Sequence, residues 1–115
     1  MHFDDRLATV LRSRADGPVT SRIQFRQLLD LLGTLPADAT GPQVNAAHDR
    51  LAELTRIIPP EIRTAIVGDC GLRLRSPRLV VALAQADPAQ SAGAIANAQL
   101  AEEQWLDLIP ALPVP

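Results

Sequence analysis

The sequence has no lysine and no tyrosine, and only one cysteine, one tryptophan and two phenylalanines among its 115 residues. The single cysteine, Cys70, cannot form an internal disulfide, which is typical of proteins from a reducing compartment. No run approaches the roughly 18 uninterrupted apolar residues that a membrane-spanning helix needs. Residues 1–6 lack the basic-then-apolar order of a secretory signal. These absences exclude an internal disulfide framework and predict a cytoplasmic chain with no membrane partner.

Excess positive charge and aromatic side chains are also lacking. The formal net charge is −2, and aromatic residues make up 3% of the chain. Nucleic-acid-binding proteins normally combine clustered positive charge with aromatic side chains on which bases can stack. We therefore expect no nucleic acid partner.

Alanine and leucine are abundant, with 18 and 17 copies, whereas the residues that favour strands are scarce beside them. This composition favours an all-α fold. The length suits one domain, and 47% apolar residues suffice for a core of its own. We predict a single helical domain over residues 1–115.

Proline and glycine divide the chain into about seven short helices. The clearest helix is predicted to begin at Ser21, which has capping-box spacing with Gln24, and to end before Pro36. Ser76 and Asp87, each followed by proline, are predicted N-caps of two later helices. The remaining helices are predicted over about residues 3–15, 42–58, 60–67 and 101–109.

Each helix should bury its apolar face. For the clearest helix this face is a stripe of large residues with helical spacing: Phe25, Leu28, Leu32 and Leu35. The helix after Pro42 has a similar stripe, formed by Val44, Ala47, Leu51, Leu54 and Ile58. In the shorter helices the expected buried residues are Ile62, Ala65 and Ile66, then Ala92, Ile95 and Ala96, and finally Trp105, Leu108 and Ile109.

A weak internal repeat runs through these helices. Four times, apolar residues stand eight and five positions before a proline, and the prolines are Pro36, Pro59, Pro88 and Pro113. Such a helix-turn repeat favours a solenoid-type stack, in which each unit buries its apolar face on the next. The alternative is an irregular helical bundle, because any leucine-rich helix that ends at a proline gives the same pattern.

Candidate catalytic groups are few. His48 is followed by Asp49, a pairing that suggests a phospho-accepting histidine, although the residues that normally follow such a histidine are absent. The alternative is a partly exposed helical histidine. His2, His48 and Cys70 lack metal-ligand spacing, and no glycine-rich phosphate loop or serine elbow is present. We expect a non-enzymatic chain without metal or cofactor.

The charges are distributed unevenly. Residues 1–78 carry +2, from 11 arginines against 9 acidic residues, whereas residues 79–115 carry −4 from four acidic residues. The densest basic segment contains Arg73, Arg75 and Arg78, which we identify as a possible interaction surface. The alternative is a solvated loop with local ion pairs. The charge asymmetry could drive head-to-tail association or docking on an acidic partner.

The last eight residues, LIPALPVP, are apolar and rich in proline, unlike most free chain ends. This composition leads us to expect a domain cut from a longer chain. The alternative is a tail that docks in a groove.

Four segments of the sequence carry a family resemblance: residues 1–7 (MHFDDRL), 24–33 (QFRQLLDLLG), 71–80 (GLRLRSPRLV) and 105–113 (WLDLIPALP). Together they resemble the N-terminal helical region of a group of proteobacterial sensor histidine kinases. Residues 79–109 are also similar to bacterial proteins with HEAT-like repeats. The resemblance implies a regulatory domain that precedes a PAS-type sensor and the kinase core, and it assigns no catalytic residue to this chain.

The resulting hypothesis is a non-catalytic domain that associates with itself or contacts the downstream kinase domains. One alternative is a phosphorelay domain that uses His48. Another is a stand-alone helical adaptor or a ligand sensor with an apolar pocket between helices near Trp105.

Overall fold

A computed structural model describes residues 2–12, 17–36 and 39–112. These residues form seven α-helices and a final 3-10 turn, which confirms the all-α prediction. The elements are α1 (His2–Arg12), α2 (Pro18–Gly33), α3 (Pro42–Ile57), α4 (Pro60–Val67), α5 (Pro77–Ala86), α6 (Pro88–Asn97), α7 (Glu102–Leu108) and η1 (Ile109–Ala111). Within the described ranges, none of the helices has the length and apolar character needed to cross a bilayer.

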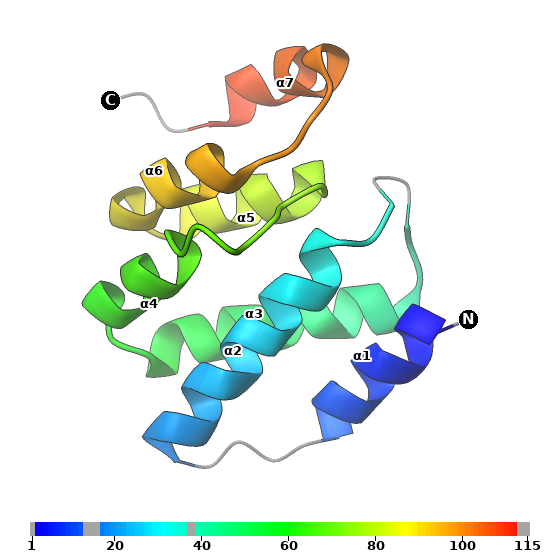
Figure 1. The fold of residues 1–115 in the computed structure, drawn as a ribbon, viewed down its shortest axis with the longest axis vertical. Coiled ribbons are helices and arrows are strands. Elements are labelled where there is room, and N and C mark those ends of the chain that lie inside the picture. The colour runs from blue at the N-terminus through cyan, green and yellow to red at the C-terminus, as the bar shows by residue number, and fades with distance from the viewer. Residues whose placement is uncertain (1, 13–16, 37–38, 113–115) are drawn as a thin grey trace.

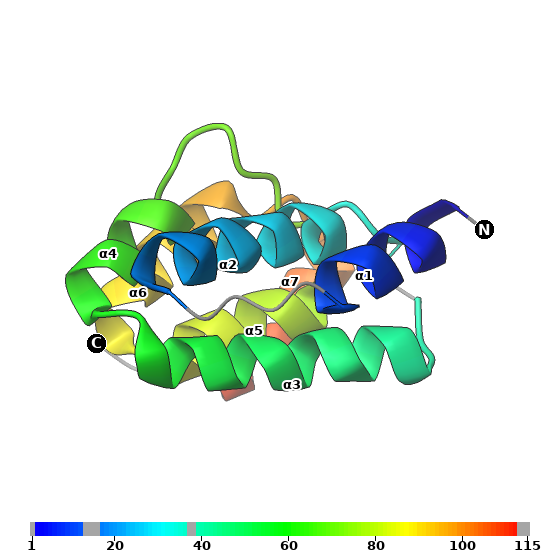
Figure 2. The same cartoon turned by 90° about the horizontal axis from the view of Figure 1, so that it is seen from below.

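The helices form two groups. α1, α2 and α3 pack on one another, α6 packs on both α4 and α5, and α7 packs on α5. Along the longest axis, α1–α3 occupy one end and α7 the other, with α4–α6 between them (Figure 1). Seen from below, α1 and α2 lie on the same side of α3 (Figure 2). The HEAT-like order of stacking stays a prediction.

The two long apolar stripes form the centre of the core. Phe25, Leu28 and Leu32 of α2 are at most 1% exposed. The α3 stripe is buried as well, as the sequence predicted. Over sixteen residues, a repeat near 3.6 fixes which face turns inward, because the apolar side chains must all leave water together.

The start of α2 differs from the prediction. The helix begins at Pro18 rather than at Ser21, and Gly17 is its N-cap. Thr20 satisfies the helix start, since its hydroxyl accepts a hydrogen bond from the Gly17 backbone N–H at 3.0 Å. Ser21 and Gln24 are instead buried inside the helix. Proline at the first helical position has a preset φ angle, which favours the earlier start.

The buried faces of α4 and α6 also differ from the prediction. α4 buries Arg63 and Val67, whereas Ile62 and Ile66 are half-buried and Ala65 is exposed. The reason lies in the close approach of α6: a Cβ on Gly93 would lie 2.9 Å from the Gly68 Cα. This approach is possible only where α6 has no side chain, so the face of α6 that carries Gly93 turns inward, and the face that carries Ile95 does not.

The corresponding residues of α6 follow the same logic. Gln90 and Ala94 are buried, and the predicted residues Ala92, Ile95 and Ala96 are exposed.

Buried polar side chains join the helices in both groups. In the first group, Gln24 donates to the Val10 carbonyl at 2.9 Å and accepts from Arg50 Nε at 2.9 Å. In the second group, Gln90 donates to the Leu83 carbonyl at 2.8 Å and accepts from Arg63 at 3.3 Å. Each glutamine therefore links three helices or helix ends.

The predicted N-caps are confirmed. The Ser76 hydroxyl accepts from the Leu79 backbone N–H at 3.3 Å, and the Asp87 carboxylate accepts from the Ala89 N–H at 2.9 Å. Asp87 also pairs with Arg63 at 3.5 Å, which connects this cap to the buried polar cluster.

The last helix buries less than predicted. Leu108 is buried and Trp105 is half-buried, but Ile109 is exposed. Ile109 lies just after the end of α7 and begins the 3-10 turn.

Candidate interaction surface

The basic segment lies between α4 and α5. Leu72 and Leu74 are buried, whereas Arg73 and Arg75 are exposed, so the side chains alternate. Backbone hydrogen bonds hold this conformation: the Leu74 N–H donates to the Asn97 carbonyl at 3.0 Å, and the Arg75 N–H donates to the Gly33 carbonyl at 2.7 Å. The backbone of the segment is therefore anchored, while its arginine side chains face solvent.

Arg78 has a different environment. It lies in the first turn of α5, and its guanidinium donates to Asn45 Oδ1 on α3 at 2.8 Å. Within the described part of the chain, neither Arg73 nor Arg75 forms an ion pair. The structure thus gives Arg78 a contact between helices and leaves the other two arginines available to a partner.

His48 is half-buried on α3, where it faces the start and the last turns of α5. Burial lowers the pKa of its ring from 6.5 to about 4, the positive charge of Arg78 acts in the same direction, and Asp49 opposes it. The imidazole is therefore neutral at physiological pH. Its half-buried position limits the access that a phosphoryl donor would need.

The other potential ligands are dispersed. Cys70 is exposed in the segment after α4, and the side chain of His2 lies outside the described residues. Among the described residues, no three histidine, cysteine, aspartate or glutamate side chains gather closely enough to hold a metal ion.

An apolar hollow that the sequence did not predict lies between α2 and α4. It has a volume of about 560 Å³, and its apolar lining includes Ile23, Ile62 and Ile66. Ile23 is 52% exposed. The signal in the sequence was the apolar face of α4, which was assigned to the core but instead forms one wall of this hollow.

The rim of this hollow is charged. Arg26 pairs with Asp30 and with Asp69, each at 3.2 Å. The backbone N–H of Gly71 donates to Asp69 at 2.7 Å, and this bond together with Arg26 lowers the pKa of the Asp69 carboxyl. Asp69 therefore stays ionised and holds Arg26 across the edge of the hollow.

A second hollow adjoins the first at Arg22, which lines both. Its volume is about 580 Å³, and it lies between the start of α2 and the end of α3, next to Ile57 and Arg50. Arg50 forms an ion pair with Glu53 at 3.0 Å, whereas Arg22 forms no ion pair with any described residue.

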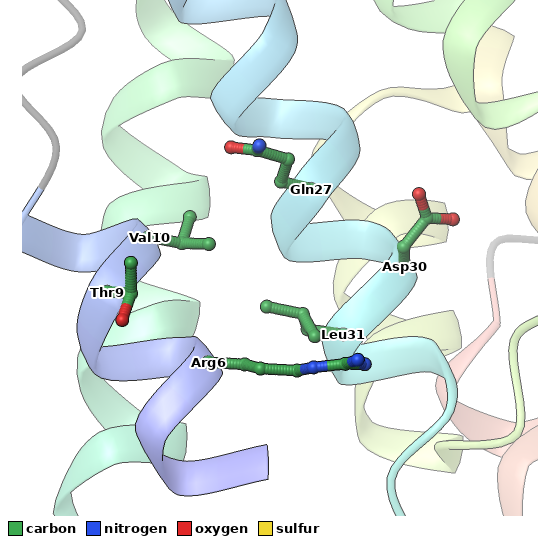
Figure 3. A pocket seen from close by; sticks show the side chains of 6 residues that line it. All are labelled: Arg6, Thr9, Val10, Gln27, Asp30 and Leu31. Atoms are coloured by element: carbon green, nitrogen blue, oxygen red, sulfur yellow. The ribbon is translucent and has the colours of Figure 1, made fainter. Parts of the chain in front are cut away.

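A third hollow, of about 420 Å³, separates α1 from α2. Figure 3 shows Val10 and Leu31 pointing into the space and Arg6 extending from α1 towards α2. A small ligand would find apolar walls and one guanidinium here. This hollow lies away from Trp105, where the sequence suggested a pocket.

The outer face of α7 combines apolar and acidic side chains. Leu106 is 62% exposed and Ile109 is also exposed. Glu102 and Glu103 lie one turn before Leu106, and both are exposed. Within the described residues, no ion pair involves either carboxylate.

We compared the chain with protein-family models, curated proteins and solved structures, and none of them matches it.

Proposed function

We propose that residues 1–115 form a non-catalytic protein-interaction domain at the N-terminus of a cytoplasmic two-component sensor histidine kinase. The domain mediates self-association or transmits a signal to PAS and kinase domains downstream. The observation that carries the interaction role is the open apolar hollow between α2 and α4. The link to sensor histidine kinases rests on the sequence resemblance.

The hollow supports this role because it leaves apolar side chains accessible on the surface of the folded chain. Ile23 stands at its edge, and Ile62 and Ile66 line the opposite wall. Contiguous apolar surface with a polar rim is typical of protein-binding sites. A groove between two helices suits an amphipathic helix, which inserts apolar side chains spaced three or four residues apart.

The kinase assignment is tested by the length of the native gene product. We expect intact-mass analysis of the endogenous protein to give a mass well above the 12.4 kDa of this chain, with an ATP-binding kinase core downstream. A native protein that ends near residue 115 would contradict the kinase assignment and leave an independent adaptor.

The role of the hollow is tested in the full-length protein by Ile23→Glu. This substitution places a charge in the hollow, so we expect weaker contact with the partner domain and altered autophosphorylation from ATP. Ile95→Glu is the matched control, because Ile95 is an exposed isoleucine on α6, outside the lining of this hollow. Equal effects of the two substitutions, or no effect of either, would contradict the proposal.

A second candidate function is phosphotransfer through His48. The pairing of His48 with Asp49 in the sequence suggests this function, and the half-buried ring on α3 limits the access of a phosphoryl donor. His48→Gln should then abolish acid-labile phosphorylation by a partner kinase. Unchanged phosphorylation in this variant would eliminate the candidate.

A further inference from the structure

The large apolar side chains that are exposed among the described residues fall mainly into two groups. Val19, Ile23 and Ile57 lie on α2 and at the end of α3, and Leu106 and Ile109 lie on α7 and the turn after it. Ile95 on α6 is the remaining member. The two groups lie towards opposite ends of the molecule, because α1–α3 occupy one end of the longest axis and α7 the other (Figure 1).

The first group has a cationic centre. We call Val19, Arg22, Ile23 and Ile57 the α2 surface. Val19 and Ile23 are four residues apart and therefore share a face of the helix, and Arg22 lies beside them. Arg22 lines both neighbouring hollows and has no ion-pair partner among the described residues. Its guanidinium is thus available to a carboxylate.

Other charges also face this surface. Arg26 is already held by Asp30 and Asp69. Glu61 of α4 lines the hollow opposite Ile23 and forms no ion pair within the described ranges. An acidic partner would therefore be attracted by Arg22 and repelled by Glu61. Replacing Glu61 with a basic residue should then strengthen its binding.

The second group has an anionic border. We call Glu102, Glu103, Leu106 and Ile109 the α7 face. Leu106 lies three residues from both Glu103 and Ile109 and four from Glu102, so the helical repeat brings the four side chains to one side. Among the described residues, the α7 face is thus apolar with unpaired carboxylates, whereas the α2 surface is apolar with an unpaired guanidinium.

We propose that the α2 surface binds the α7 face of a second copy of this chain. Leu106 and Ile109 cover the apolar residues of the α2 surface, and Glu103 pairs with Arg22, with Glu102 beside it. The complementarity extends to the whole chain, since residues 1–78 carry +2 and residues 79–115 carry −4. The inference rests on the proposed interaction role and names the partner of the same surface.

The contact joins two different surfaces and is therefore heterologous. Because the surfaces lie towards opposite ends of the molecule, each copy leaves one of them open to the next, and the assembly grows beyond a dimer. The contact is small, with seven helical residues in α7 and a three-residue turn. Association should therefore be weak, concentration-dependent and reduced by salt.

The experiment is sedimentation velocity of the chain over a series of concentrations at low and high salt. Arg22→Glu and Glu103→Arg should each weaken association about threefold to tenfold, because each replaces an attraction with a repulsion. Glu61→Arg should tighten association by a similar factor. An equimolar mixture of the Arg22→Glu and Glu103→Arg chains should recover association, since every contact between unlike copies then joins opposite charges.

Arg12→Glu is the matched control, because Arg12 is an exposed arginine at the end of α1 that lies outside the α2 surface and the basic segment and also has no ion pair among the described residues. It should leave association unchanged. Circular dichroism of each variant checks that the helices are retained. An Arg75→Glu chain that loses association while Arg22→Glu keeps it would overturn the proposed contact, yet it would leave the interaction role intact at the basic segment.

Two further outcomes would also overturn the contact. One is a strict monomer at all concentrations, in which case binding of the downstream kinase domains decides separately whether the interaction role holds. The other is a mixture of the two charge-reversed chains that associates no better than either chain alone.

Discussion

The two helix groups, α1–α3 and α4–α7, each contain a buried glutamine that is hydrogen-bonded to an arginine, but the two pairs have different surroundings. In each group a buried glutamine donates to a backbone carbonyl and accepts from an arginine: Gln24 with Arg50, and Gln90 with Arg63. The side chain of Arg50 is 23% exposed, whereas that of Arg63 is 8% exposed. The first arginine adds a surface link to an apolar core, and the second is itself part of the core.

This difference follows from the sizes of the neighbouring side chains. α2 and α3 contribute long apolar stripes, which fill most of the space between these helices. α4 and α6 are shorter and approach closely at Gly68 and Gly93. The Arg63 guanidinium is buried between the same helices, and its cost of desolvation must be offset by the Ile58 carbonyl, the Gln90 side chain and the Asp87 carboxylate.

The largest expected effect comes from Arg63→Met. This change leaves the Gln90 amide oxygen and the Ile58 carbonyl without their donor, so we expect the free energy of unfolding to fall by about 3–5 kcal/mol. Chemical denaturation followed by circular dichroism measures it. Adding Gln90→Leu should recover little of the loss, because it removes the orphaned acceptor but also takes the donor away from the buried Leu83 carbonyl. A loss no larger than that of Arg50→Met would contradict the comparison.

The junction between the two groups should respond to Gly33→Ala. A Cβ at Gly33 would lie 2.3 Å from the Arg73 carbonyl oxygen, so the segment between α4 and α5 would have to move. We expect a loss of about 1–3 kcal/mol in thermal or chemical unfolding. Gly17→Ala is the control, since its Cβ would meet only the Thr20 hydroxyl at 3.6 Å. Equal stability of the two variants would argue against tight packing at the junction.

Arg50→Met should have a smaller effect than either change. The substitution removes the hydrogen bonds from Arg50 to Gln24 and Glu53. Because this position is partly exposed, water can hydrogen-bond to the groups that lose their donor. We expect a loss of about 1 kcal/mol in the same denaturation experiment. Because the methionine keeps the apolar part of the side chain, a much larger loss would mean that the first group also depends on its polar link.

The smallest expected effect is the pH dependence that His48 gives to the contact between α3 and α5. The pKa of its ring is lowered from 6.5 to about 4, chiefly by burial. The unfolded chain therefore binds more protons in this interval, so stability is full above pH 6.5 and falls as the pH approaches 4. Since the ring is half-buried, we expect less than about 1 kcal/mol.

His48→Gln isolates this contribution. The difference in unfolding free energy between the original chain and the variant should change with pH across the interval, and the carboxylates common to both chains should cancel. A difference that is constant with pH would show that the ring has an ordinary pKa.

The sequence by itself determined the helix content, the two long apolar stripes and the N-caps at Ser76 and Asp87. Each is a local property: a repeat near 3.6 residues selects one face, and a side-chain oxygen before a proline satisfies the first free N–H groups. The dense basic segment can likewise be read from the sequence. So can the uneven distribution of all eleven arginines along the chain.

Only the tertiary structure decided which faces of the short helices are buried and where the apolar surface opens. In α4 and α6 the close contact of Gly68 with Gly93 outweighs the apolar pattern, so Arg63 is buried and Ile66 lines a hollow. The α2 surface also depends on the tertiary structure, because its residues Ile23 and Ile57 lie on different helices. A short helix has too few apolar residues to fix its own orientation, so its neighbours fix it.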